Sequence, residues 1–174
     1  MIDLKRIILV RTKERCPAEG KLHLVDAAAL CAGFPLTSVL YDNECFNRLE
    51  FSVVGFASTV NDFMDDSIRH HMLFPFVERI AHSRDGGVPD GHMSRRYLFM
   101  CKEIDKLIRA YLTDTNLASL TYMWMDREFR LVCESANNLH HEPKRFFWDH
   151  CLRILDRALE IPHTADYFIK LEHA

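Results

Sequence analysis

The fold is decided by one stretch of the chain, Ser94–Leu112, which reads SRRYLFMCKEIDKLIRAYL. Apolar side chains recur in it every three or four residues, the spacing that places them on one face of an α-helix. The apolar positions are Tyr97, Met100, Cys101, Ile104, Leu107, Ile108 and Tyr111. Charged side chains, among them Arg96 and Glu103, fill the positions between them. The stretch therefore predicts an amphipathic helix with one buried face.

Two later stretches have the same periodicity, and they complete the C-terminal half. They cover Leu117–Asn137 and Pro143–Pro162. Pro143 suits the first turn of a helix, because an N–H group in that turn has no partner within the helix. Three long helices with short connections predict an antiparallel bundle.

The N-terminal half is less regular, and four of its segments give separate signals. The segments are Lys5–Thr12 (a β-rich run), Leu24–Ala32 (a short helix ending at Gly33), 37–56 (strand or helix) and Ser58–Ser83 (a helix interrupted at Pro75). We therefore expect a mainly α-helical fold, with a C-terminal antiparallel bundle and an N-terminal part that has room for one or two strands.

The composition is that of one globular domain. The chain has 174 residues, of which 48% are hydrophobic, and its net charge is −3. A loop at 83–92, rich in glycine, separates two halves of this single domain, 1–174. The six cysteines are widely spaced and include no C-x-x-C pair. With no apolar run long enough for a membrane span, we expect no membrane association and a reducing compartment, the cytoplasm of the producing cell or of a host.

Ten histidines raise the question of a metal site. Asp62, Asp66 and His70 follow one another at four-residue intervals, which would place them on one face of a continuous helix. Helical metal sites usually add a carboxylate and histidine pair from a second helix, and the sequence supplies none. We therefore predict no metal and no cofactor, and regard these three residues as weak candidate ligands.

A second candidate site is the segment RFFWDH, from Arg145 to His150. It resembles the R-x4-H motif of the HEPN-family ribonucleases, which are all-α proteins with a metal-free site usually completed across a dimer. The resemblance implies that His150 would handle the proton of a ribose 2′-hydroxyl and that Arg145 would stabilise phosphate charge. The alternative, which we prefer, is an ordinary helix in which Arg145 pairs with Asp149.

Two further features point weakly to nucleic acid or to another charged partner. Asp26–Val39 looks like the first helix and turn of a helix-turn-helix, but Asp42 and Glu44 would then face phosphate, so we interpret it as a plain helix end. Residues 5–21 carry six Lys or Arg against two Glu, and residues 59–90 carry three Arg against six Asp or Glu. This polarity suits either a charged partner or an ordinary soluble surface.

The absence of any other catalytic motif favours a non-catalytic protein-interaction module of the inhibitor, immunity or adaptor type. Its contact surface would use aromatic residues outside the main apolar stripes, namely Phe146, Trp148, Trp124 and Phe99. The expected partner is another protein or a second copy of the chain. Alternatively, the same aromatic residues would complete the core against the N-terminal half. Nucleic acid is expected only under the alternative, a metal-independent endoribonuclease that uses Arg145 and His150.

Overall fold

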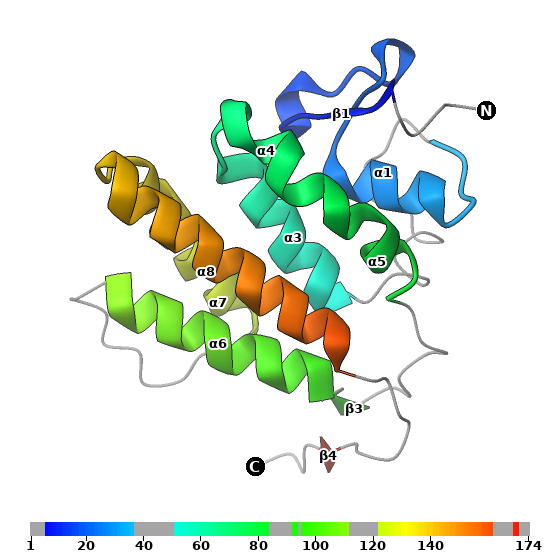
Figure 1. The fold of residues 1–174 in the computed structure, drawn as a ribbon. Coiled ribbons are helices and arrows are strands. Elements are labelled where there is room, and N and C mark those ends of the chain that lie inside the picture. Colours follow the sequence, from blue (N-terminus) through cyan, green and yellow to red (C-terminus); the bar gives the residue numbers. More distant parts are fainter. Residues whose placement is uncertain are drawn as a thin grey trace.

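The structure is a computed structural model that describes residues 6–36, 51–83, 92–93, 95–111, 122–161 and 169–170. It describes the backbone alone at residues 51, 92–93, 122–126 and 169–170. In chain order the elements are β1 (Ile8–Leu9), η2 (Thr12–Glu14), η3 (Pro17–Glu19), β2 (Lys21–Leu22), α1 (Leu24–Cys31), α3 (Phe51–Phe63), α4 (Asp66–Leu73), η4 (Phe74–Phe76), α5 (Val77–Ala81), β3 (His92–Met93), α6 (Arg95–Tyr111), α7 (Tyr122–Asn137), α8 (His141–Glu160) and β4 (Ile169–Lys170). The fold is mainly α-helical, as predicted (Figure 1).

Helix α3 joins the two halves of the molecule (Figure 1). It packs against α1 in the N-terminal half and against α6, α7 and α8 in the C-terminal half. Its small apolar residues, such as Val53 and Ala57, are buried, and Phe56 stacks on Phe129 of α7 with 4.8 Å between the ring centroids. A helix that is apolar on most sides belongs inside a protein. Residues 51–56, which fitted either strand or helix, are therefore helical, and 37–50 lie outside the described residues.

Helices α6, α7 and α8 pack against one another as the helical bundle of the C-terminal half (Figure 1). The apolar stripe of α8 is buried, and Phe147 packs edge-on against Tyr111 of α6 with 5.0 Å between centroids. Helix α8 contains Pro143 in its first turn, as expected. No helix within the described ranges is long and apolar enough to cross a bilayer.

Arg96 shows that α6 and α8 run in opposite directions. Its Nε donates to the carbonyl of Ala158 at 2.8 Å, and its Nη2 donates to the carbonyl of Ile161 at 2.7 Å. These carbonyls belong to the C-terminal end of α8, where a helix has no internal donors left. The expectation that Arg96 covers the exposed face of its helix is therefore wrong, because the side chain is buried as a cap.

The N-terminal part contains one small parallel sheet. β1 pairs with β2, and the chain between them turns through Gly20 in the left-handed region at φ 73°. A Cβ at Gly20 would lie 2.9 Å from the carbonyl oxygen of Arg6, so this turn requires glycine. Only Ile8–Leu9 of the predicted strand Lys5–Thr12 is extended in the sheet, because Thr12 already begins η2.

The predicted helix Ser58–Ser83 is interrupted twice. The interruption at Pro75 was expected and is the 3-10 turn η4. A second interruption follows Phe63, and the buried side chain of Arg69 lies against it. Arg69 Nε donates to the carbonyl of Asn61 at 2.7 Å, and its Nη2 also donates to the carbonyl of Met64. The side chain thus supplies donors to carbonyl groups at the C-terminal end of α3, and α4 continues from there in a new direction.

Candidate functional site

Asp62, on the last turn of α3, is the centre of a polar junction between three elements. Its Oδ1 accepts hydrogen bonds from Thr12 N at 2.8 Å and from Thr12 Oγ1 at 2.9 Å. The same oxygen lies 3.6 Å from Nε2 of His23, which precedes α1. The carboxylate therefore binds η2 to the end of α3 and lies beside the N-cap of α1.

His23 is the N-cap of α1 and is completely buried. Its Nδ1 accepts from Val25 N at 3.2 Å, and Asp26 Oδ2 accepts from His23 N at 3.3 Å, which together form a capping box. Because Nδ1 accepts, the neutral ring carries its proton on Nε2, the atom that faces Asp62. Burial lowers the pKa of His23 in spite of the nearby carboxylates of Asp62 and Asp26.

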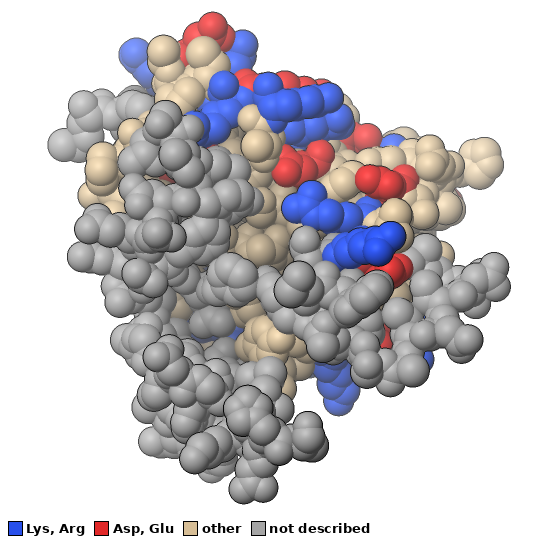
Figure 2. Space-filling view, turned by 180° about the vertical axis from the view of Figure 1, so that it is seen from behind, with Lys and Arg blue, Asp and Glu red and all other residues tan. Residues whose placement is uncertain are grey.

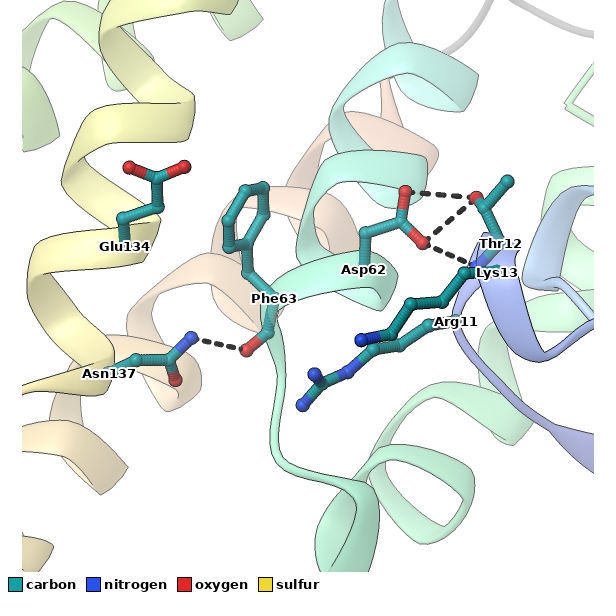
Figure 3. Close-up of a pocket in the computed structure, with 7 residues that line it drawn as sticks. All are labelled: Arg11, Thr12, Lys13, Asp62, Phe63, Glu134 and Asn137. Carbon is teal, nitrogen blue, oxygen red and sulfur yellow. Dashed lines mark hydrogen bonds between the residues drawn. The ribbon is translucent and has the colours of Figure 1, made fainter.

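A pocket of about 480 Å³ opens beside this junction. Its lining residues are Arg11, Thr12, Lys13, Asp62, Phe63, Glu134 and Asn137. Figure 3 shows Arg11 and Lys13 reaching into it from one side, while Glu134 and Asn137 face it from α7 on the other. Asn137 Nδ2 donates to the carbonyl of Phe63 at 2.8 Å, so this part of the rim is fixed.

The three weak metal candidates do not come together. Asp62 belongs to α3, whereas Asp66 and His70 belong to α4, because the chain breaks between the two helices. Asp66 pairs with Arg69 at 2.6 Å, and His70 Nδ1 accepts from Leu9 N at 3.2 Å. The described part of the chain contains no group of three potential ligands. The expected helical face is wrong, because it assumed one continuous helix.

The four aromatic residues predicted for a contact surface have different surroundings. Phe146 is 67% exposed on α8, whereas Trp148 on the same helix is completely buried and stacks edge-on against Phe147. Phe99 is half-buried on α6, with Arg157 over its ring at 5.4 Å. The side chain of Trp124 lies outside the described residues. The prediction is therefore wrong for Trp148, which contributes to the core.

Arg145 and His150 do not form a shared site within one chain. Five residues along a helix correspond to a rotation of about 140°, so the two side chains leave α8 in different directions. Arg145 is exposed, and its Nε lies 3.9 Å from Oδ2 of Asp149. His150 is half-buried towards α6, and burial, assisted by Arg153, lowers its pKa. A site completed by a second copy stays a prediction.

The two segments of opposite charge meet each other within the molecule. Arg11 Nε lies 3.3 Å from Asp66 Oδ1, and Asp62 holds Thr12. Figure 2 shows blue and red side chains interleaved on the visible described surface. Among the described residues, Arg11 is therefore a cation of the basic segment that pairs with the acidic segment, whereas Arg15 pairs with Asp26 and Lys21 with Glu19.

The helix-turn-helix segment supplies one confirmed element. Its first helix is α1, which ends at Cys31 with Ala32 as the C-cap and Gly33 in the left-handed region at φ 86°. This is the plain helix end that the sequence indicated. The second helix of the motif would begin at Thr37 and lies outside the described residues.

Comparison of the chain with protein-family models, with curated proteins and with solved structures finds no match. The functional argument therefore rests on the residues and their geometry.

Sequence reasoning missed His23, Arg69 and Arg96, the buried polar residues that organise the junction and the helix ends. One signal could have identified His23. A polar residue immediately before an apolar helix, with an acid three positions later, is the pattern of a capping box, and His23 and Asp26 have this spacing. Arg69 and Arg96 give no comparable local signal.

Proposed function

We propose that the protein is a non-catalytic interaction module whose contact surface is the exposed face of α8. The observation that carries the proposal is Phe146, which is 67% exposed while the two aromatic residues that follow it are completely buried. An aromatic side chain held in water on a regular helix gains free energy when a partner covers it. An adaptor, inhibitor or immunity protein needs only such a surface.

The contact surface is a stripe along α8, which we call the Phe146 face. It consists of Glu142, Phe146, Asp149, Arg153 and Arg157. These residues follow one another at intervals of three or four, so they share one side of the helix. All but Asp149 are exposed, and Asp149 is half-buried. The buried stripe of α8 occupies the opposite side.

The order of charges along this face favours a particular partner, a second copy of the same helix. Glu142 and Asp149 place negative charge in the first half of the stripe, and Arg153 and Arg157 place positive charge in the second half. Two such stripes in antiparallel orientation bring Glu142 of each copy against Arg157 of the partner subunit, which is the self-complementarity of a two-fold contact. The two Asp149 side chains meet at the centre, where each keeps Arg145 of its own chain as its ion-pair partner. Glu160 lies about one helical turn beyond Arg157, outside the part of the helix that the two copies share in this pairing.

Phe146 fits the same arrangement. In a pairing centred between Asp149 and His150, each Phe146 meets Arg153 of the partner subunit, a contact in which the guanidinium lies on the ring. Arg157 already stacks in this way on Phe99 of its own chain. Phe99 would therefore line the margin of the contact surface.

The free thiols support the expected location. No disulfide joins the described cysteines, and Cys151 is completely buried as a small hydrophobic residue. We propose the reducing cytoplasm of the producing cell or of a host as the place of action.

The proposal is tested by sedimentation velocity of the full chain over a wide concentration range. We expect a dimer that dissociates on dilution, and Phe146→Ser should weaken it by about tenfold or more, since a Phe side chain contributes about 2 kcal/mol when buried. The matched control is Leu131→Ser, another exposed apolar residue on a helix, which should leave the dimer unchanged. A chain that stays monomeric throughout, or a dimer insensitive to Phe146→Ser, contradicts the proposal.

A further inference from the structure

Helix α1 is capped by a side chain whose charge can change near neutral pH. Helix caps are usually Ser, Thr, Asp or Asn, whose oxygens accept a hydrogen bond throughout this range. In α1 the acceptor is Nδ1 of His23, which accepts from Val25 N at 3.2 Å. A neutral imidazole has one acceptor nitrogen, whereas a protonated imidazole has two donors and no acceptor. Protonation would therefore place a donor against the N–H of Val25 and remove the cap.

The charged groups that face the ring already have other partners. Among the described residues they are Asp62 from α3, Asp26 from α1 and Arg15 at the end of η2. Asp62 accepts both hydrogen bonds of Thr12 (Figure 3), and its Oδ1 is 3.6 Å from His23 Nε2, too far for a hydrogen bond. Asp26 is bound by Arg15, whose Nη2 donates to Oδ1 at 2.9 Å. A protonated ring would thus have carboxylates nearby but no hydrogen bond to either of them through Nε2.

The imidazole of His23 is completely enclosed by protein. A positive charge on it would have no water around it, and burial of a charge without hydrogen-bonded partners is costly. Burial accordingly lowers the pKa of His23, in spite of the two carboxylates. A proton therefore binds more strongly to a ring that has left this site than to the enclosed ring.

Helix α1 is poorly able to hold itself in place without its cap. It has only 8 residues, Leu24–Cys31, and an isolated helix of this length is unstable in water. It packs chiefly against α5, with which it lies side by side in Figure 1, and also against α3. The C-terminal half holds together through separate contacts among α6, α7 and α8.

We propose that His23 is a pH switch that releases α1 from α5 when the ring takes up one proton. Release uncovers apolar side chains that the folded protein buries, among them Leu24 and Val25 of α1 and Val77 and Ile80 of α5. The bundle of α6, α7 and α8 stays folded. The switch does not involve the Phe146 face, so the two proposals stand or fall separately.

The experiment is hydrogen–deuterium exchange of the full chain, read by mass spectrometry at about pH 7.5 and about pH 5, with labelling times scaled for the chemical exchange rate. Peptides that cover α1 should lose about tenfold of their protection at the lower pH, because opening then takes up a proton and histidine titrates near pH 6.5. Peptides that cover 147–158 of α8 should keep their protection.

Two variants serve as controls. His23→Asn keeps a capping side chain but does not titrate in this range, so its α1 peptides should be equally protected at both pH values. His150→Asn removes the other histidine whose pKa burial lowers, and it should respond to pH as the wild type does.

Any of three results would overturn the proposal. One is scaled protection of α1 that is the same at both pH values in the wild type. Another is an equal loss of protection in His23→Asn, which would assign the effect to a different group. The third is a parallel loss in α8, which would describe unfolding of the whole chain and not the release of one helix.

Discussion

Nε2 of the buried His23 lies 3.6 Å from Oδ1 of Asp62, and the two residues lie 39 positions apart in the sequence (62 − 23). The other ring nitrogen of His23 accepts from Val25 N at 3.2 Å. The ring therefore serves two elements in its neutral form, as the cap of α1 and as the neighbour of the carboxylate that ends α3. We therefore expect protonation of this one side chain to destabilise the N-terminal half.

The free energy of unfolding should fall as the pH is lowered from about 7 to about 5. Burial lowers the pKa of His23 in the folded protein, so the unfolded chain takes up a proton that the folded chain does not bind. The stabilisation that the neutral ring of His23 contributes to folding is complete above the ordinary pKa of histidine and is lost as the pH falls below it. Urea titrations at several pH values measure the slope.

His23→Asn provides the control for this prediction, because asparagine caps a helix equally well but does not titrate in this range. The variant should show a smaller loss of stability on acidification. His150→Asn removes the contribution of the second histidine whose pKa is lowered by burial. An unchanged slope in His23→Asn would contradict the role given to His23.

Asp62→Ala should destabilise the protein by about 1–3 kcal/mol, because the backbone N–H and the hydroxyl of Thr12 lose their acceptor. Thr12→Val removes only the hydroxyl contact and should cost less than half as much. A double-mutant cycle in urea measures the coupling of the two side chains. Strictly additive effects would show that the contact at 2.9 Å carries no stability.

Arg69→Met should destabilise by about 2–4 kcal/mol, since the carbonyls of Asn61 and Met64 would lose a buried donor. Arg79→Met is the matched control. Arg79 pairs with Asp156 on the surface, where both side chains are well exposed, so its loss should cost about 1 kcal/mol or less. Equal losses in thermal unfolding would refute the capping role of Arg69.

Trp148→Ala should strongly reduce folding stability, whereas Phe146→Ser should hardly change it. Trp148 is completely buried, and its truncation should cost about 3–5 kcal/mol of folding stability. Phe146→Ser should change the stability of the monomer by about 0.5 kcal/mol or less, since its side chain faces solvent. A marked destabilisation by Phe146→Ser, measured in dilute solution, would mean that Phe146 belongs to the core.

The helices of the C-terminal half could be predicted because their apolar residues recur with the helical period. The burial of Trp148 could not be predicted in this way. Trp148 lies on the flank of the α8 stripe, and α8 packs against α3, which is distant in sequence, as well as against α6 and α7. The break after Phe63 could not be predicted for a similar reason. The spacing of apolar residues predicts that Arg69 is a surface charge, whereas the tertiary structure buries its side chain against the end of α3.

The candidate sites also differ in how far the sequence predicts them. The exposure of Phe146 follows from its place opposite the buried stripe of its own helix. The pocket at Asp62 could not be predicted, because η2, α3 and α7 contribute its walls and only the fold brings them together. The single local signal was the spacing of His23 and Asp26.

The central claim, that the Phe146 face binds a second copy through its order of charges, is tested most directly by mixing two charge variants. The first carries Glu142→Lys and Asp149→Lys, and the second carries Arg153→Glu and Arg157→Glu. Sedimentation velocity should show each variant alone as a monomer, because its stripe repels its own copy, and the equimolar mixture as a dimer. A mixture that stays monomeric, or variants that dimerise alone as well as the wild type does, would contradict the claim.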